Sequence, residues 1–346
     1  MDKDFTKNNG VFVAVVIPAY RVENRILSVI SSIPDYIDHI IVVDDASPDH
    51  TSDLVMSVSN PKLHLIRHEK NQGVGGAMLS GYSFALSLGA DIVVKVDGDG
   101  QMDLEYLPYL LEPIQSFHAD YTKGNRFLHY EALKTMPFMR KFGNLSLTFF
   151  TKVASGYWNI FDPTNGYTAI SAKRLKALNP WRISKNYFFE TSMLCELRRT
   201  NAVVEDVAIP AIYADEKSSI NILRELLLFS RNLFKRTVSR IGFQYFLFDF
   251  TATSLYFIIS FVLGTFGVIW GITKWVHSAQ TNIPATTGTV LIAVLPIILA
   301  VQFLTQAVAL DISRVPVVVK RVPQFFNFAE DWKKFLKNEP LLVSKK

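Results

Sequence analysis

Apolar and polar positions alternate along the first part of the chain in a way that predicts strands and helices in turn. Short apolar runs, typical of buried strands, are each followed by a segment whose apolar positions have helical spacing. The predicted strands are residues 11–20, 39–47, 62–69 and 90–97, and the predicted helices are residues 25–33, 50–59 and 71–89. Strands that alternate with helices indicate a mainly parallel sheet covered on both faces. The pattern therefore predicts an α/β fold.

Two long uncharged segments follow toward the C-terminus. Phe250–Thr273 contains no charged residue, and neither does Thr286–Leu310. As a helix the first segment spans about 36 Å, against a hydrocarbon core of about 30 Å. The alternative, a pair of buried core helices, would leave an unusually apolar domain. We therefore predict a transmembrane hairpin in residues 246–312, with helices over about 249–274 and 286–310.

Basic residues flank this hairpin. Residues 220–240 have the pattern of an amphipathic helix with Arg224, Arg231 and Lys235 on one face. Such a helix suits a membrane surface with anionic head groups, and an ordinary solvated helix is the alternative. Further basic residues lie within 314–321, whereas the linker between the spans is nearly neutral. The positive-inside rule then predicts a multi-pass membrane protein in which both flanks of the hairpin, and so both termini, are cytoplasmic and the linker lies on the far side.

Composition narrows the classes of partner. The chain has 346 residues, enough for one large domain or two of ordinary size. Lys and Arg total 36 against 31 Asp and Glu, a mild excess that does not point to nucleic acid. Cys195 is the single cysteine, which excludes an intrachain disulfide framework.

Carboxylates gather where the predicted strands end. Ligands of such sheets bind beyond the carboxyl ends of the strands. In the stretch KVDGDGQ, Asp97 and Asp99 stand two residues apart after an apolar strand. If the strand continued through them, both would face one side, and at about 5 Å with an effective dielectric of about 20 their repulsion would cost roughly 3 kcal/mol. A cation should offset this repulsion.

A divalent metal ion suits these residues. Mg²⁺ and Mn²⁺ prefer carboxylate and carbonyl oxygens and often bridge substrate phosphates. Asp97, Asp99 and Gln101 offer such oxygens and leave positions open for a diphosphate, while Gly98 and Gly100 let the backbone bend. The sequence therefore predicts these three side chains as ligands of Mg²⁺ or Mn²⁺.

Several motifs together resemble one enzyme family. VVIPAYRVE, IIVVDDASPDHT, NQGVGGA and VDGDGQ, in this order, resemble the nucleotide-sugar-binding half of family 2 inverting glycosyltransferases with the GT-A fold. KGNRF, DPTNGYTAIS and YFFETSML, followed by a basic helix and paired spans, resemble the polyprenyl-phosphate branch: dolichyl-phosphate mannose synthase and the bacterial undecaprenyl-phosphate glucosyl and aminoarabinosyl transferases. The resemblance covers roughly residues 11–320. The Q-x-x-R-W signature of processive synthases is absent, which favours transfer of one sugar.

The resemblance implies an order of domains. A GT-A (Rossmann-like, mainly parallel) catalytic domain is expected in residues 1–218 and basic amphipathic interfacial helices in 219–245. The transmembrane hairpin of residues 246–312 follows, and residues 313–346 form a cytoplasmic tail.

The resemblance also assigns residues to the donor half of the site. The residues implied to bind the nucleotide-sugar are Pro18, Tyr20, Glu23, Asp44, Gly73 and Asp97. Asp45 and Asp49 stay open between nucleotide contacts and turn-stabilising side chains. Gly73, Gly75 and Gly76 are interpreted as helix-start packing near the nucleotide.

The acceptor half is assigned in the same way. Asp99, Asp162 and Arg126 are the implied catalytic group, with Asp162 either a base or an orienting carboxylate. The side chains expected at the acceptor phosphate are Ser219, Arg231 and Lys235. For each cation the alternative is an ordinary surface residue. Glu190, in FFET, is left between site and helix surface and outside the assignment.

The function that the resemblance implies is metal-dependent transfer of one sugar, with inversion, from a nucleotide-sugar to polyprenyl (undecaprenyl) phosphate. UDP is favoured over GDP as the nucleotide of the donor. The transfer is expected at the cytoplasmic face of the inner (plasma) membrane, with the catalytic domain in the cytoplasm. A homo-oligomer, by family resemblance a tetramer, is a further expectation. One alternative uses another lipid acceptor, such as diacylglycerol. The other is a catalytically silent, nucleotide-binding membrane adaptor, against which the acidic cluster argues.

Overall fold

The computed structural model describes residues 10–128, 138–210, 222–338 and 341–344. The chain divides into two units, one made of residues 1–236 and 316–346 and the other of residues 237–315. The first unit therefore contains two stretches of sequence that the second unit separates.

The first unit is built on one sheet of eight strands within the described residues, in the order β7-β5-β6-β4-β1-β2-β3-β8. The strands are β1 (Val13–Ala19), β2 (His39–Asp44), β3 (Leu63–His68), β4 (Ile92–Lys95), β5 (Tyr121–Asn125), β6 (Thr168–Ser171), β7 (Val204–Ala208) and β8 (Leu341–Ser344). Strands β4, β1, β2 and β3 pair in parallel, as do β5 and β7, while β6 and β8 are antiparallel to their neighbours. The mainly parallel α/β sheet predicted from the sequence is confirmed.

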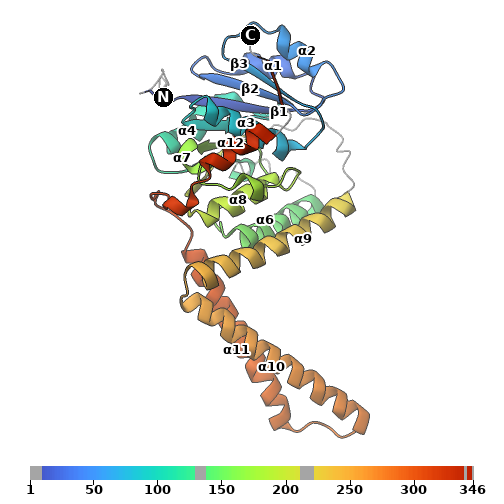
Figure 1. Ribbon diagram of the computed structural model, residues 1–346. Helices are drawn as coiled ribbons and strands as arrows, with labels where there is room; N and C mark the ends of the chain where they lie inside the picture. Colours follow the sequence, from blue (N-terminus) through green and yellow to red (C-terminus); the bar gives the residue numbers. More distant parts are fainter. Residues whose placement is uncertain (1–9, 129–137, 211–221, 339–340, 345–346) are drawn as a thin grey trace. The chain divides into compact units, whose positions relative to one another are not determined.

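Helices cover both faces of this sheet (Figure 1). The α-helices of the unit are α1 (Ile26–Ser32), α2 (Thr51–Ser57), α3 (Val74–Ser87), α4 (Leu107–Gln115), α6 (Phe138–Ser155), α7 (Ala172–Leu175), α8 (Phe189–Arg199), α12 (Ala329–Asn338) and most of α9 (Ile222–Ile241). Strand β1 is buried on both sides: Val15 belongs to the core shared with α1, α2 and α4, whereas Val16 packs under Gly81 of α3. Its uninterrupted apolar sequence follows from this double burial.

Helix α9 is amphipathic, as the sequence indicated. Leu233 is buried and Phe229 packs on Phe188, beside Ala154 of α6, so the apolar face of α9 covers α6 and α8. On the basic side, Arg231 is exposed.

The C-terminal segment belongs to the first unit, which the linear pattern did not reveal. Trp332 of α12 is 1% exposed, and its indole Nε1 donates to the carbonyl oxygen of Leu178 over 3.0 Å. Ser83 of α3 donates to the backbone carbonyl of Trp332 over 2.6 Å, and α12 lies beside α3 in Figure 1. Strand β8 then pairs with the edge strand β3. The tail therefore completes the sheet and covers α3.

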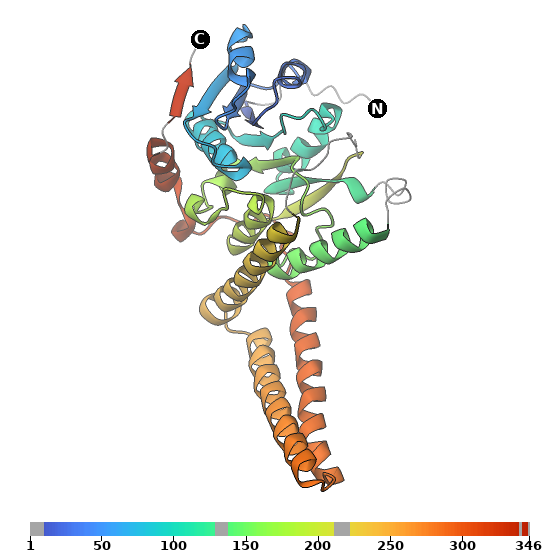
Figure 2. The ribbon, with the colours of Figure 1, turned by 90° about the vertical axis from the view of Figure 1, so that its right-hand side faces the viewer.

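The second unit is a hairpin of two long helices, α10 (Ala252–Thr281) and α11 (Thr287–Ser313), preceded by a π-helical turn at Gly242–Phe248 (Figure 2). Both helices are long and apolar enough to cross a membrane, and only 6% and 11% of their most apolar windows are buried. That exposure argues against the pair of buried core helices considered above. Helix α10 continues to Thr281, so the break is shorter than the linker predicted from the sequence.

Small residues bring the two helices together. A Cβ on Gly267 would lie 2.7 Å from the carbonyl oxygen of Ala293, and Ser260 donates to the carbonyl oxygen of Ala300 over 2.8 Å. At the base of the hairpin the Arg240 guanidinium binds Asp311 over 2.7 and 3.0 Å. Close backbone approach through small residues is how membrane helices associate, because lipid provides no hydrophobic drive between them.

Candidate active site

The ends of β1, β2 and β4 meet at one edge of the sheet. In the register of the parallel ladder Ala19 pairs with Asp44, and Val16 pairs with Lys95. A Cβ on Gly98 would lie 3.2 Å from the carbonyl oxygen of Pro18. The first strand end and the acidic turn after β4 are therefore neighbours, as the topological rule predicts.

Asp97 and Asp99 lie in a turn rather than on a strand. Strand β4 ends at Lys95, and Gly100 has φ +72°, which bends the chain. The Asp99 carboxylate accepts a hydrogen bond from the amide of Gln101 over 3.0 Å. The expectation that strand alternation sets the two carboxylates side by side is wrong, because β4 ends at Lys95, before Asp97, and the chain turns at Gly98 and Gly100 between and after the two carboxylates.

The first cation that offsets this acidic turn is part of the chain. The Nζ of Lys95 lies 2.6 Å from Asp97 Oδ1, and the Lys95 side chain is 2% exposed. Burial alone would lower the pKa of Lys95, but the negative charges of Asp97 and Glu190 outweigh burial and raise the pKa above its ordinary value. Lys95 therefore stays charged and holds one oxygen of Asp97.

The acidic turn has the chemistry of a divalent metal site. Asp97, Asp99 and Gln101 line a cavity of about 140 Å³ and present carboxylate and amide oxygens. A Cβ on Gly166 would lie 2.5 Å from Asp97 Oδ2, so this glycine keeps the space beside that oxygen open. Within the described residues no group of three or more His, Cys, Asp or Glu side chains could hold a metal by itself. These residues fit an Mg²⁺ or Mn²⁺ ion whose coordination an oxygen-rich ligand completes.

The predicted nucleotide residues have different degrees of exposure. Tyr20 is 43% exposed, and Glu23 accepts a hydrogen bond from the amide of His50 over 3.1 Å. Asp44 is fully buried and accepts hydrogen bonds from the amide of Ser47 and the hydroxyl of Ser52. Its role as a nucleotide contact stays a prediction, and in this structure its carboxylate holds the turn after β2.

Asp45 organises the loop that precedes α3. Its carboxylate accepts hydrogen bonds from the amides of Gln72 and Gly73 over 2.8 and 2.7 Å and lies 2.7 Å from Nδ1 of His68. Gly73 has φ +82°, and a Cβ there would lie 2.6 Å from the carbonyl oxygen of Lys185. Of the two interpretations of Asp45, a nucleotide contact or a turn-stabilising side chain, these hydrogen bonds show the second.

Asp49 has a similar part in the turn before α2. Its carboxylate accepts hydrogen bonds from the hydroxyl of Thr51 over 2.7 Å and the amide of Glu23 over 3.3 Å. Burial acts to raise the pKa of Asp49, but these hydrogen bonds together lower it below its ordinary value.

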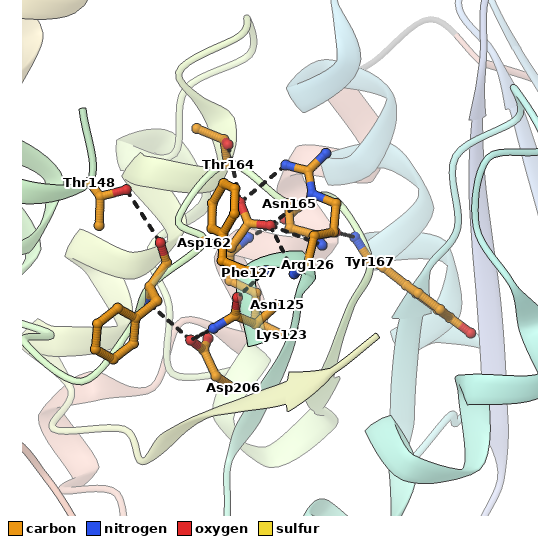
Figure 3. A network of polar contacts seen from close by, with 11 residues as sticks. Lys123, Asn125, Arg126, Phe127, Thr148, Asp162, Thr164, Asn165, Tyr167 and Asp206 are labelled. Carbon is orange, nitrogen blue, oxygen red and sulfur yellow. Dashed lines mark hydrogen bonds and ion pairs between the residues drawn. The ribbon is translucent and has the colours of Figure 1, made fainter. Parts of the chain in front are cut away.

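Asp162 and Arg126, two of the predicted catalytic residues, form a two-point ion pair (Figure 3). The Nε and Nη2 atoms of Arg126 donate to the two oxygens of Asp162 over 2.8 and 3.1 Å. Asp162 is fully buried, whereas the Arg126 side chain is 38% exposed. The carboxylate therefore fixes the guanidinium while leaving it within reach of solvent.

A buried lysine and a partly buried carboxylate lie on the strands next to this pair. Lys123 on β5 pairs in register with Asp206 on β7, and its ammonium donates to the carbonyl oxygen of Asn165. Burial lowers the pKa of Lys123 to about 8, against the opposing charges of Glu190 and Asp162. Burial likewise raises the pKa of Asp206 to about 6.

One cavity joins residues predicted to bind the donor with residues predicted to act on the acceptor. Its lining includes Asp97, Asp99 and Gln101 from the acidic turn, and Arg126, Thr164 and Asn165. The carboxylates of the acidic turn and the guanidinium of Arg126, which are far apart in the sequence, thus line the same cavity.

Two of the side chains predicted at the acceptor phosphate are absent from the lining of this cavity. Arg231 and Lys235 are exposed on α9. Ser219 lies outside the described residues.

Sequence reasoning missed the buried lysines Lys95 and Lys123. The signal for Lys95 was present, since a lysine in an otherwise apolar strand needs a buried partner. Nothing in the linear pattern singled out Lys123 or paired it with Asp206, because that pairing depends on how β5 and β7 come together.

Comparison with known proteins then places the chain in a family. Residues 14–178 match the sequence profile of Glycosyl transferase family 2. The UDP-N-acetylglucosamine–dolichyl-phosphate N-acetylglucosaminyltransferase of Methanococcus voltae is 32% identical over 216 residues, which are 58% of this chain and 86% of that protein. The chain belongs to glycosyl transferase family 2. The predicted family is confirmed.

This family 2 chain is similar to further proteins. The undecaprenyl-phosphate mannosyltransferase of Micrococcus luteus is 30% identical over 202 residues, which are 57% of this chain and 82% of that protein. Among solved structures, glucosyl-3-phosphoglycerate synthase from Mycobacterium tuberculosis, in complex with Mn²⁺, UDP and phosphoglyceric acid, superposes with a TM-score of 0.51 at 22% identity and covers 67% of this chain and 79% of that chain. The structural likeness confirms the GT-A-like fold.

Proposed function

We propose that this family 2 glycosyltransferase moves one sugar from a nucleotide diphosphate sugar to polyprenyl phosphate, with inversion at the sugar carbon. The observation that carries the proposal is the single cavity lined both by the acidic turn and by Arg126. The reaction brings two phosphate-bearing substrates together, so it needs one oxygen-rich cation site and one cationic side chain facing the same space.

A UDP-sugar is the proposed donor. The name of the Methanococcus voltae relative specifies UDP-N-acetylglucosamine, and the mycobacterial structure holds UDP with Mn²⁺. The donor half consists of the turn at Asp97–Gln101 and the neighbouring ends of β1 and β2, with Tyr20 exposed beside them. A divalent ion held by Asp97, Asp99 and Gln101 would supply positive charge to the departing diphosphate.

The acceptor needs orientation more than proton removal. A phosphate monoester is already largely ionised near neutral pH. Asp162 is buried and fully engaged, so we assign it the orienting role, holding Arg126 toward the acceptor phosphate. A fixed guanidinium matches phosphate oxygens geometrically and loses little mobility on binding.

We further propose that α10 and α11 cross the inner membrane and that both flanks are cytoplasmic. The high hydropathy and exposure of both helices support this, as do the basic residues at 231–240 and 314–321. The exposed Arg231 and Lys235 would then attract the anionic phosphate group of the lipid acceptor. A homo-oligomer is proposed by resemblance, and sizing in detergent tests it.

The test is a donor and acceptor panel with the full-length protein in detergent and Mn²⁺. UDP-N-acetylglucosamine, UDP-glucose and GDP-mannose are each combined with undecaprenyl phosphate, with diacylglycerol, or with no acceptor. Nucleoside diphosphate release and the mass of the glycolipid are measured. We expect release to require undecaprenyl phosphate and to be fastest with a UDP-sugar.

Each contrary result has a distinct meaning. A product formed only with diacylglycerol would replace the proposed acceptor. Nucleotide binding without turnover on any acceptor would support the silent adaptor.

A matched pair of variants tests the acidic turn. Asp99→Ala should abolish release of the nucleoside diphosphate, whereas Asp53→Ala, which removes an exposed carboxylate at α2, should not.

A further inference from the structure

A buried polar row crosses the sheet behind the acidic turn. Lys95 on β4 pairs in register with Thr168 on β6, and Thr168 pairs with Lys123 on β5. All three residues are at most 1% exposed. Directly paired residues of neighbouring strands point to the same face, so the three side chains project together. Two lysines so deeply buried need carboxylates near them.

Glu190 is the carboxylate that meets this row. It lies in the first turn of α8, its side chain is 15% exposed, and its Oε1 is 3.4 Å from Lys95 Nζ. Lys95 therefore lies between two carboxylates, Asp97 at 2.6 Å and Glu190 at 3.4 Å.

The two carboxylates face different surroundings. Asp97 is 31% exposed and lines the cavity, whereas Glu190 is absent from the cavity lining. An ammonium group has three donors, so Lys95 can serve both, and its positive charge is divided between them.

We propose that Glu190 and Lys95 together set how much negative charge Asp97 presents to a divalent cation. This inference rests on the proposed function and assigns Glu190 as a positioning residue that acts through Lys95. Glu190 balances part of the positive charge of Lys95. Lys95 therefore neutralises Asp97 only in part, and the remaining negative charge of Asp97 can attract the ion.

Removing each charge should have an effect of opposite sign. Glu190→Gln removes the competitor, and the undivided Lys95 charge then neutralises Asp97 more completely. Lys95→Met removes the cation and leaves Asp97 more negative. Through-space interaction over these distances gives an expected change of about tenfold in Mn²⁺ affinity for each variant, weaker for Glu190→Gln and tighter for Lys95→Met.

The double variant separates this role from a merely structural one. Lys95→Met with Glu190→Gln removes one charge of each sign, so the net charge returns to that of the parent. Its Mn²⁺ affinity should return to within about threefold of the parent. Damage to the fold would instead make the double variant worse than either single one.

The measurement is equilibrium Mn²⁺ binding to the full-length protein with UDP and no acceptor, followed by electron paramagnetic resonance of free Mn²⁺. Glu196→Gln is the matched control: it is the same substitution on the same helix, at a buried carboxylate bound by Arg182 and Arg236. It should lower the melting temperature and leave Mn²⁺ affinity unchanged.

The outcomes divide cleanly. Weaker binding in Glu190→Gln and its recovery in the double variant support the charge pair, even if Lys95→Met fails to fold. Parent-like binding in Glu190→Gln, or no recovery in the double variant, overturns the charge pair while leaving the proposed function intact. A parent protein that binds neither Mn²⁺ nor UDP overturns both.

Discussion

Asp206 makes the stability of the catalytic unit depend on pH in a way that can be calculated. Its Oδ2 accepts hydrogen bonds from Asn125 over 2.7 Å, shown in Figure 3, and from the amide of Phe161 over 2.8 Å. In the chain, these two donors directly precede Arg126 and Asp162, the two members of the ion pair. Its other oxygen is buried with no hydrogen-bond partner in the described part of the chain. Asp206→Asn keeps the shape and one acceptor oxygen and removes the charge.

The magnitude follows from the pKa of Asp206, which burial raises from 3.8 to about 6. A carboxyl group with a raised folded-state pKa contributes stability below the pKa of the unfolded chain. That contribution is lost as pH rises through the folded-state value, because the unfolded chain ionises first. Two pKa units correspond to about 3 kcal/mol, so the parent should lose about that much relative to Asp206→Asn between about pH 4 and pH 6.

Thermal unfolding in detergent, followed by circular dichroism at pH 4.5, 5.5, 6.5 and 7.5, measures this difference. At about 2–4 °C per kcal/mol, the melting temperature of Asp206→Asn should gain several degrees on the parent as pH rises, up to about 12 °C. Asp53→Asn, at an exposed carboxylate, is the control and should show no such trend. A difference between parent and Asp206→Asn that does not change with pH would falsify the assignment.

Four further outcomes are expected. Asp162→Asn should lower turnover about 100-fold with UDP affinity retained, because it loosens Arg126 without touching the donor half; normal turnover would exclude the orienting role. Removing metal with EDTA should stop turnover and adding Mn²⁺ should restore it; turnover that persists in EDTA would exclude a metal at the acidic turn. Replacing Arg231 and Lys235 together by Ala should raise the half-saturating lipid concentration by about 10- to 30-fold and spare nucleotide binding, at about 1 kcal/mol per charge; an equal loss of both would refute their role. Trp332→Ala should destabilise the catalytic unit by about 3–5 kcal/mol, seen as a lower melting temperature, and an unchanged value would mean that the tail is dispensable for folding.

The fold class and the two membrane-length helices could be predicted from local pattern alone. Strands such as Val13–Ala19 are apolar on both faces because helices cover both, and that leaves a continuous run in the sequence. The two uncharged spans could be predicted equally well from the sequence. Helix α10, however, extends beyond its uncharged span to Thr281, because polar residues can also form helical hydrogen bonds.

The edge of the sheet at which β1, β2 and β4 end could also be predicted as the place of the site, because parallel strands with helical crossovers bring their carboxyl ends to one side. That rule predicts the proximity of Pro18 and the acidic turn, which the structure confirms. The rule does not say where strand β4 ends. Because β4 ends at Lys95 and the chain then turns, Asp97 and Asp99 do not have the side-by-side arrangement that strand alternation predicts.

What the sequence determined by itself is therefore periodic and local: strands, helices, apolar spans and the motifs at strand ends. The tertiary structure alone decided which charged residues come together, since Lys95 forms an ion pair with Glu190 across about 95 residues and Lys123 stands opposite Asp206 on the neighbouring strand, about 80 residues away in the chain. It also decided that Trp332, after the hairpin, packs on α3. Such contacts depend on strand order and on the path of the returning chain, and they leave no period in the sequence because each is made once.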